Sequence, residues 1–150
     1  MKTGFLFLSA FLAAPFCFAQ KSYDPATEAQ KLFEAYKPKV EQAEMGVVEG
    51  PSAFTGDLNG DGLTDCILYF VLTPAGGGNA VIGRKAAVYL NTGKGMKVDG
   101  AFPDLKYCFG IDKIAGGVIY VGSYACEPPY NTREGSYRYR WTAKKLVAVK

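Results

Sequence analysis

The chain of 150 residues contains no histidine. This absence excludes a Ser-His-Asp or Cys-His catalytic triad, a zinc ion held by imidazole groups and a histidine-based pH switch. The rest of the composition is that of an ordinary globular protein, with 49% hydrophobic and 21% charged residues. The length suits one domain with a substantial core, and we expect a single domain over residues 20–150.

The N-terminal hydrophobic run is too short to be a transmembrane anchor. It covers residues 5–14, follows Lys2 and precedes small residues at Cys17 and Ala19. Such a run does not cross roughly 30 Å of hydrocarbon, and its layout is that of a secretory signal peptide. We therefore predict a leader of residues 1–19 cleaved after Ala19, a periplasmic or secreted protein, and no membrane span after cleavage.

The basic residues are not gathered into one cluster. Residues 20–65 hold 9 acidic and 4 basic side chains, whereas residues 66–150 hold 5 acidic and 12 basic side chains. The two halves either attract each other within one fold, or the second half offers a basic surface to a partner. Because the basic residues are scattered and export is predicted, we expect no nucleic-acid partner.

Three cysteines remain after the predicted cleavage, at positions 66, 108 and 126. In an oxidising compartment this number indicates one disulfide and one free thiol. Cys66 lies in the apolar run 66–72 and is expected to be a buried thiol, so we predict a Cys108–Cys126 disulfide across a hairpin. A strict two-residue turn at 116–117 would set Cys108 opposite Ala125, so the pairing requires a bulge or a longer turn. The alternative is three buried thiols.

One amphipathic helix is predicted near the N-terminus of the mature chain. Asp24 can cap the free amides, and Pro25 suits the first helical position. Hydrophobic residues then follow at helical spacing, at positions 29, 32, 33, 36 and 40, and this face is expected to pack on the protein's own sheet. Pro38 is expected to kink or stop the helix near Tyr36, and residues 46–52 are expected to form a linker.

The remainder of the chain has the pattern of an all-antiparallel sheet. Segments rich in Val, Ile, Tyr and Phe alternate with turn residues, and the predicted strands are 52–55, 65–72, 84–90, 96–98, 106–111, 118–124, 136–142 and 146–149. Their connections are too short for parallel crossovers. We therefore predict an α+β domain, an antiparallel β-meander sheet with the single helix packed on one face. In the last long strand, Tyr137, Tyr139 and Trp141 are expected to face inward and the intervening arginines outward.

Residues 57–65, with the sequence DLNGDGLTD, form the one segment with a distinct chemistry. Oxygen-bearing side chains occupy loop positions 1, 3, 5 and 9, and glycine occupies position 6. Ca²⁺ takes six to eight oxygen ligands on a flexible loop, and the glycine permits a sharp turn. Three carboxylates so close together repel one another unless a cation lies among them. The alternative is an Asx-rich turn without metal, because Asp, Asn and Gly favour turns in any case.

The segment lacks the glutamate at position 12 that completes an EF-hand, since Leu68 stands there and both flanks are predicted strands. Asp at position 9 followed by a strand resembles the calcium loops of FG-GAP and VCBS-type repeats. The resemblance implies a structural Ca²⁺ loop between two strands, with ligation by Asp57, Asn59, Asp61, the Leu63 carbonyl and Asp65. Without the position-12 carboxylate we expect weak binding, on the order of 10⁻⁵ to 10⁻³ M.

A wider resemblance covers residues 56–149. The acidic loop, the glycines at 76–78, the segments 87–91 and 111–114, and a tyrosine-rich terminal strand resemble small exported bacterial proteins that have no assigned activity. The resemblance implies a bacterial source and a location in the cell envelope, and it implies no substrate and no catalytic residues.

A second candidate site is the segment that contains Tyr124, Glu127, Tyr130 and Arg133. We interpret it either as a contact loop for a protein partner in the cell envelope or as an ordinary exposed connection.

The leading functional hypothesis is an exported, non-catalytic binding or structural domain stabilised by Ca²⁺. One alternative is a periplasmic inhibitor or immunity protein that blocks an enzyme partner. The other is a glycan or cell-wall hydrolase that uses paired carboxylates, although the spacing of the acidic residues does not favour it.

Overall fold

The structure is a computed structural model that describes residues 23–78, 80–129 and 132–150. The predicted leader lies outside these residues. The elements are α1 (Pro25–Glu44), β1 (Gly46–Gly56), β2 (Asp65–Pro74), β3 (Gly83–Asn91), β4 (Met96–Ala101), β5 (Cys108–Ala115), β6 (Val118–Tyr124), β7 (Arg133–Thr142) and β8 (Lys145–Ala148).

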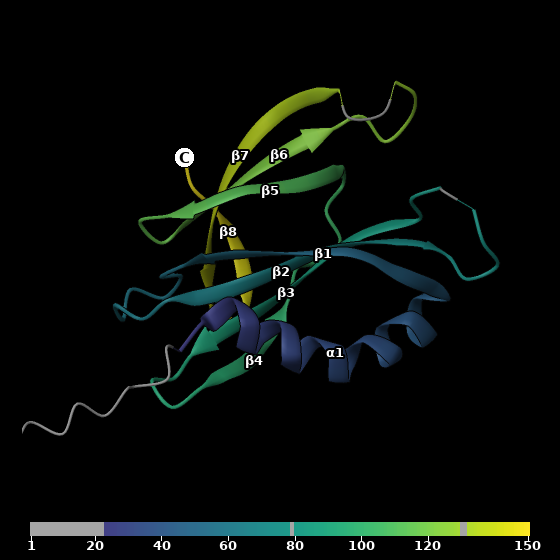
Figure 1. Cartoon of the computed structure of the whole chain (residues 1–150). Helices are drawn as coiled ribbons and strands as arrows, with labels where there is room; N and C mark the ends of the chain where they lie inside the picture. The colour runs from purple at the N-terminus through teal and green to yellow at the C-terminus, as the bar shows by residue number, and fades with distance from the viewer. Residues whose placement is uncertain (1–22, 79, 130–131) are drawn as a thin grey trace, which may run out of the picture.

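The eight strands form two four-stranded antiparallel sheets, each a simple meander. Strands β1 to β4 pair in chain order to form the helix-bearing sheet, and β5 to β8 pair in chain order to form the second sheet. Helix α1 lies on one face of the helix-bearing sheet, and the second sheet lies over its opposite face (Figure 1). The α+β class, the antiparallel meander and the single packed helix are therefore confirmed. The expectation of one sheet is corrected, because the chain leaves β4 and starts a new sheet at β5.

Two hydrophobic cores result from this three-layer arrangement. The first lies between α1 and the helix-bearing sheet and includes Phe33 and Phe70, whose ring centroids are 4.9 Å apart. The second lies between the two sheets and includes Ile67, Phe109 and Trp141. Side chains of β2 alternate between the two cores, so this strand is buried on both faces.

Helix α1 begins as predicted but continues further. The carboxylate of Asp24 accepts hydrogen bonds from the amides of Ala26 and Thr27 at 3.3 and 3.2 Å. Of the two outcomes expected near Tyr36, a kink or a stop, the stop is wrong, since the helix passes through Pro38 to Glu44. Pro38 is exposed, so the backbone carbonyl that loses its hydrogen bond there can bond to water. Among the described residues α1 is the sole α-helix, and no helix there combines the length and the apolar character needed to cross a membrane.

The predicted linker at residues 46–52 is also wrong, because β1 starts at Gly46. Val47 pairs with Thr73 and Val48 with Leu72, which places the start of β1 against the end of β2. A register shift between Glu49 and Ser52 takes up Gly50 and Pro51. A bulge tolerates proline, which has no amide to donate to a neighbouring strand.

The aromatic face of β7 points inward over most of its length. Trp141 is buried and Tyr139 is half-buried, whereas Arg138 and Arg140 are exposed, as predicted. Tyr137 departs from the expectation, because its side chain is 42% exposed. It stacks instead on Tyr107, with ring centroids 4.7 Å apart, at the margin of the inter-sheet core.

Both cores are expected to contribute to the stability of the same cooperative unit. Ile67→Ala (inter-sheet core) and Leu68→Ala (helix-side core) each remove a side chain with no exposed surface. Each substitution should lower the free energy of unfolding by about 2–5 kcal/mol in urea denaturation. Val98→Ala, at a side chain that is 53% exposed, serves as the control and should change it by less than about 0.5 kcal/mol. A single transition in every variant is the expected behaviour, and separate transitions for the two layers would contradict it.

Candidate functional site

The acidic loop, residues 57–65, connects β1 to β2 and is held together by its own side chains. The two carboxylate oxygens of Asp57 accept hydrogen bonds from the amides of Gly60 at 2.7 Å and Gly62 at 2.9 Å. Gly60 and Gly62 both have φ of +81°, a left-handed conformation that favours glycine. Loop positions 1, 4 and 6 are thereby drawn into one tight turn.

Two further side chains of the loop bond to backbone amides nearby. The side-chain oxygen of Asn59 accepts from the amide of Asp61 at 3.0 Å, and Asp61 Oδ1 accepts from the amide of Leu63 at 2.8 Å. Asn59 Nδ2 also donates to Asp61 Oδ2 at 2.9 Å. Four of the five predicted ligand residues, namely Asp57, Asn59, Asp61 and Leu63, therefore belong to one network of Asx-type hydrogen bonds.

Asp65, the fifth predicted ligand residue, is fully buried at the start of β2. Its Oδ2 accepts from the amide of Leu58, and its Oδ1 accepts from the amide of Asn91, both at 2.8 Å. The carboxylate thus joins the acidic loop to the end of β3. A carboxylate oxygen has two acceptor positions, so each oxygen retains one that a cation could occupy.

The pKa values of Asp57 and Asp65 are shifted in opposite directions. The amides of Gly62 and Gly60 lower the pKa of Asp57, because hydrogen bonds from N–H groups favour the charged form. Burial raises the pKa of Asp65, and the negative charges of Asp61 and Asp57 raise it further. Hydrogen bonds from the amides of Asn91 and Leu58 oppose this rise, so burial is the main cause of the raised pKa of Asp65.

The donor set consists only of oxygen atoms, which is the chemistry that Ca²⁺ prefers. Within the described ranges, however, no group of three or more Asp, Glu, Cys or His side chains is arranged to hold a metal ion. The carboxylates of Asp57 and Asp61 are turned toward amides of the loop rather than toward a shared centre. The chemistry of the residues fits the predicted ion, and ligation by these residues remains a prediction.

Asn91 also belongs to the site, although the sequence did not predict it. Its amide donates to Asp65, its Nδ2 donates to the carbonyl of Thr64 at 3.2 Å, and its Oδ1 accepts from the amide of Gly93 at 2.9 Å. The signal available in the sequence was the Asn91-Thr92-Gly93 turn. Nothing in the spacing indicates that this turn lies beside a loop 26 residues earlier.

The disulfide prediction is confirmed by the Cys108–Cys126 pair, whose Cα atoms are 5.4 Å apart. A bulge between Ile111 and Lys113 sets Cys108 opposite Tyr124, and the chain beyond β6 brings Cys126 back. Cys66 is free and buried, as predicted. Its pKa is raised to about 12, chiefly by burial.

The residues of the predicted partner-contact segment do not share one environment in the structure. Tyr124 packs on its own sheet, since a Cβ on Gly122 would lie 2.9 Å from the Tyr124 ring. Arg133 lies over that ring at 5.9 Å and forms an ion pair with Asp112 at 2.7 Å. Glu127 is exposed, and Tyr130 lies outside the described residues. Tyr124 and Arg133 thus contribute to packing on the outer face of the second sheet.

Comparison with protein-family models, with curated proteins and with solved structures gave no match to this chain.

Asp65→Asn is expected to weaken the junction between the acidic loop and β3. Asparagine offers one acceptor oxygen where aspartate offers two, so the amide of Leu58 or Asn91 would be buried without a partner. The free energy of unfolding in the presence of EDTA should fall by about 1–3 kcal/mol. Asp61→Asn keeps an oxygen for the amide of Leu63 and loses only the acceptor of Asn59 Nδ2, an exposed group that can bond to water, so it should change the free energy of unfolding by less than about 0.5 kcal/mol. Equal effects of the two substitutions would contradict the role of the buried carboxylate.

Cys66 is expected to resist alkylation in the folded protein. Because burial raises its pKa to about 12, the reactive thiolate is scarce at pH 8, and the thiol lacks access to the reagent. Iodoacetamide followed by mass spectrometry should label no cysteine of a chain beginning at Gln20 under native conditions. In guanidinium chloride without reductant it should label one. Labelling of three cysteines, or rapid labelling of the native chain, would contradict this assignment.

Proposed function

We propose that this protein is an exported bacterial binding or structural domain, without catalytic activity, whose acidic loop takes up a structural Ca²⁺ ion. The proposed ligands are Asp57, Asn59, Asp61, the carbonyl of Leu63 and Asp65. The ion would neutralise part of the negative charge of the loop and would hold its oxygen donors together.

The observation that carries the proposal is the placement of three carboxylates, those of Asp57, Asp61 and Asp65, on one nine-residue loop. Burial is the largest cause of the raised pKa of Asp65, and the negative charges of Asp61 and Asp57 raise it further, so the three carboxylates lie close enough to interact. None of the ion pairs among the described residues involves a carboxylate of the loop. A divalent cation would convert this repulsion into attraction.

The position of the loop supports a structural role for the ion. Asp65 ties the loop to β3 within the helix-bearing sheet. The loop also borders a cavity of about 450 Å³ together with the β5–β6 turn and Trp141 of β7. At the end of β1, Gly56 approaches β5 so closely that a Cβ there would lie 2.5 Å from Ile114. An ion that stiffens the loop would therefore stabilise the junction of the two sheets.

Two features support export to an oxidising compartment. The Cys108–Cys126 disulfide is of a kind that persists outside the reducing cytosol. The remaining thiol of the described chain, Cys66, is buried and protected from exchange.

The non-catalytic part of the proposal is supported by the absence of histidine, the commonest general acid–base residue, from the whole sequence.

Calcium is expected to bind weakly and to raise stability. For a Kd of about 10⁻⁴ M, 10 mM Ca²⁺ would add about 2.7 kcal/mol to the free energy of unfolding. Protein stripped with EDTA should show saturable heat on titration with CaCl₂ in calorimetry, together with a higher melting temperature. Mg²⁺ should have a smaller effect, because it demands near-ideal octahedral geometry.

Asp57→Asn provides the matching test of the ligand set and should weaken Ca²⁺ binding by at least about tenfold, since it removes one carboxylate of the loop. Glu34→Gln removes one negative charge from the exposed face of α1 and should leave the affinity unchanged. Absence of both calcium heat and a calcium-dependent melting shift in the unsubstituted protein would overturn the proposal.

A further inference from the structure

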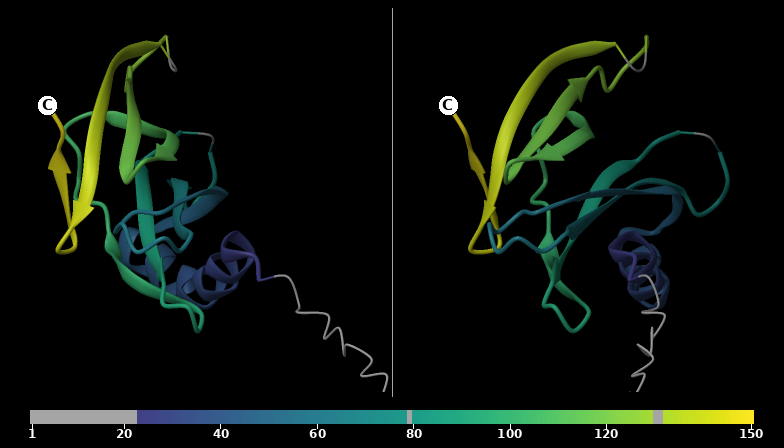
Figure 2. Two further views of the ribbon diagram at one scale, coloured as in Figure 1. Left: turned by 90° about the vertical axis from the view of Figure 1, so that its left-hand side faces the viewer. Right: turned by 60° about the vertical axis from the view of Figure 1, so that its left-hand side comes forward.

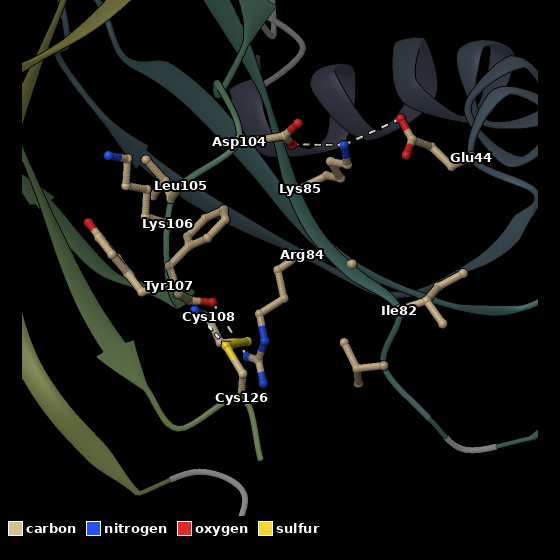
Figure 3. Close-up of a pocket in the computed structure, with 13 residues that line it drawn as sticks. Glu44, Ile82, Arg84, Lys85, Asp104, Leu105, Lys106, Tyr107, Cys108 and Cys126 are labelled. Atoms are coloured by element: carbon tan, nitrogen blue, oxygen red, sulfur yellow. Dashed lines mark hydrogen bonds and ion pairs between the residues drawn. A yellow bond between two sulfur atoms is a disulfide. The ribbon is translucent and has the colours of Figure 1, made fainter.

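A cavity of about 550 Å³ lies between the start of β3 and the segment that leads into β5 (Figure 3). The acidic loop is near the other end of β3, where Asp65 bonds to Asn91. Asn91 lies seven positions after Arg84 along the extended strand, a distance of roughly 23 Å. The cavity is therefore a separate feature of the molecule, and nothing inferred from it depends on calcium.

The charges that line the cavity do not balance. Three cationic side chains, Arg84, Lys85 and Lys106, face two carboxylates, Glu44 and Asp104, which leaves one net positive charge. Lys85 forms ion pairs with both of these carboxylates. Its Nζ lies 3.3 Å from Glu44 Oε1 and 3.1 Å from Asp104 Oδ1. Lys106 is exposed, and its amine lies away from Arg84 (Figure 3).

Arg84 has no counter-ion among the described residues and, unlike the exposed Lys106, is partly buried. Its Nη1 donates to the hydroxyl of Tyr69 at 3.1 Å and to the carbonyl of Phe109 at 3.4 Å, which fixes the guanidinium between the two sheets. Its Nε is buried and has no acceptor. In the part of the chain that the structure describes, Arg84 forms no ion pair with a carboxylate. A guanidinium presents its donors as a planar fork that matches a carboxylate.

The walls beside Arg84 are apolar. The side chains of Val81 and Ile82 are 48% and 51% exposed, and both line the cavity. Ile82 stands on the opposite side of the guanidinium from the Cys108–Cys126 disulfide (Figure 3). Two adjacent exposed aliphatic side chains beside the unpaired guanidinium of Arg84 form an amphipathic site. Cavities that bind small molecules have volumes of roughly 300–1,000 Å³, so this one is large enough for a ligand.

We propose that this cavity binds a small amphipathic carboxylate, with its anionic group at Arg84 and its hydrocarbon body against Val81 and Ile82. One unit of negative charge balances the single excess positive charge of the lining residues, which favours a monoanion over a dianionic phosphate. The hydrogen bonds of Arg84 to Tyr69 and Phe109 hold its charge in place before a ligand arrives.

Octanoate is a suitable probe, and octan-1-ol has the same chain without the charge. In ¹H–¹⁵N correlation spectra of the full mature chain, octanoate should produce saturable shifts of the Arg84 Nε–H signal and of the amides of residues 81–83. Octan-1-ol and octyl phosphate should bind at least about tenfold more weakly, because neither supplies a single carboxylate charge. The same shifts are expected in EDTA and in CaCl₂, so failure of calcium binding and failure of this site are distinguishable.

Arg84→Met should reduce octanoate affinity by at least about tenfold. Arg138→Met, at an exposed arginine on the outer face of β7, should leave it unchanged. Because Arg84 also bonds across the two sheets, Ile82→Asp offers a second test that places a negative charge at the cavity while retaining the guanidinium, and it should abolish the shifts. Absence of saturable shifts with octanoate in the unsubstituted protein, or equal binding of octan-1-ol, would overturn the proposal.

Discussion

The apolar run at residues 66–72 contains no charged side chain, so β2 is stable only where both of its faces are covered. Helix α1 covers one face and the second sheet covers the other (Figure 2). Phe33 of the helix packs in the first core, and Phe109 and Trp141 pack in the second. This two-sided burial determines the order of the layers. It also places the acidic loop and the Arg84 cavity near opposite ends of β3, the strand that pairs with β2 over seven residues.

Much of the fold could be predicted from the sequence because its signals are local. The capping pair Asp24-Pro25, the glycine turns and the apolar runs depend on neighbouring residues, and β6 was predicted at its observed bounds, 118–124. The errors arose where pairing with distant residues overrides local preference. Pro51 suggested a linker, yet the valines before it pair with β2 and a bulge takes up the proline. The division into two sheets depends on how the chain turns after β4, which strand patterns do not encode.

The candidate site was predictable in part for the same reason. The acidic loop is contiguous, and the structure places four of the five predicted ligand residues in one local network. Burial of Asp65 against Asn91 depends on the register of β2 and β3, which a single sequence does not reveal. Arg84 belongs to no sequence motif. It stands out only in the structure, because Glu44 and Asp104 pair with the neighbouring Lys85 and leave Arg84 without a counter-ion in the described chain.

The deep position of Cys66 bears on how the chain matures. If oxidation begins before β2 is enclosed, Cys66, Cys108 and Cys126 are all accessible. Disulfides to Cys66 would then compete with the Cys108–Cys126 disulfide. Chain entropy favours closure of the 18-residue loop between Cys108 and Cys126 over the 42-residue loop from Cys66 to Cys108 by about 0.8 kcal/mol. That preference is modest. Docking of α1 onto β2 buries Cys66 in the first core and would thereby withdraw its sulfur from competing disulfides.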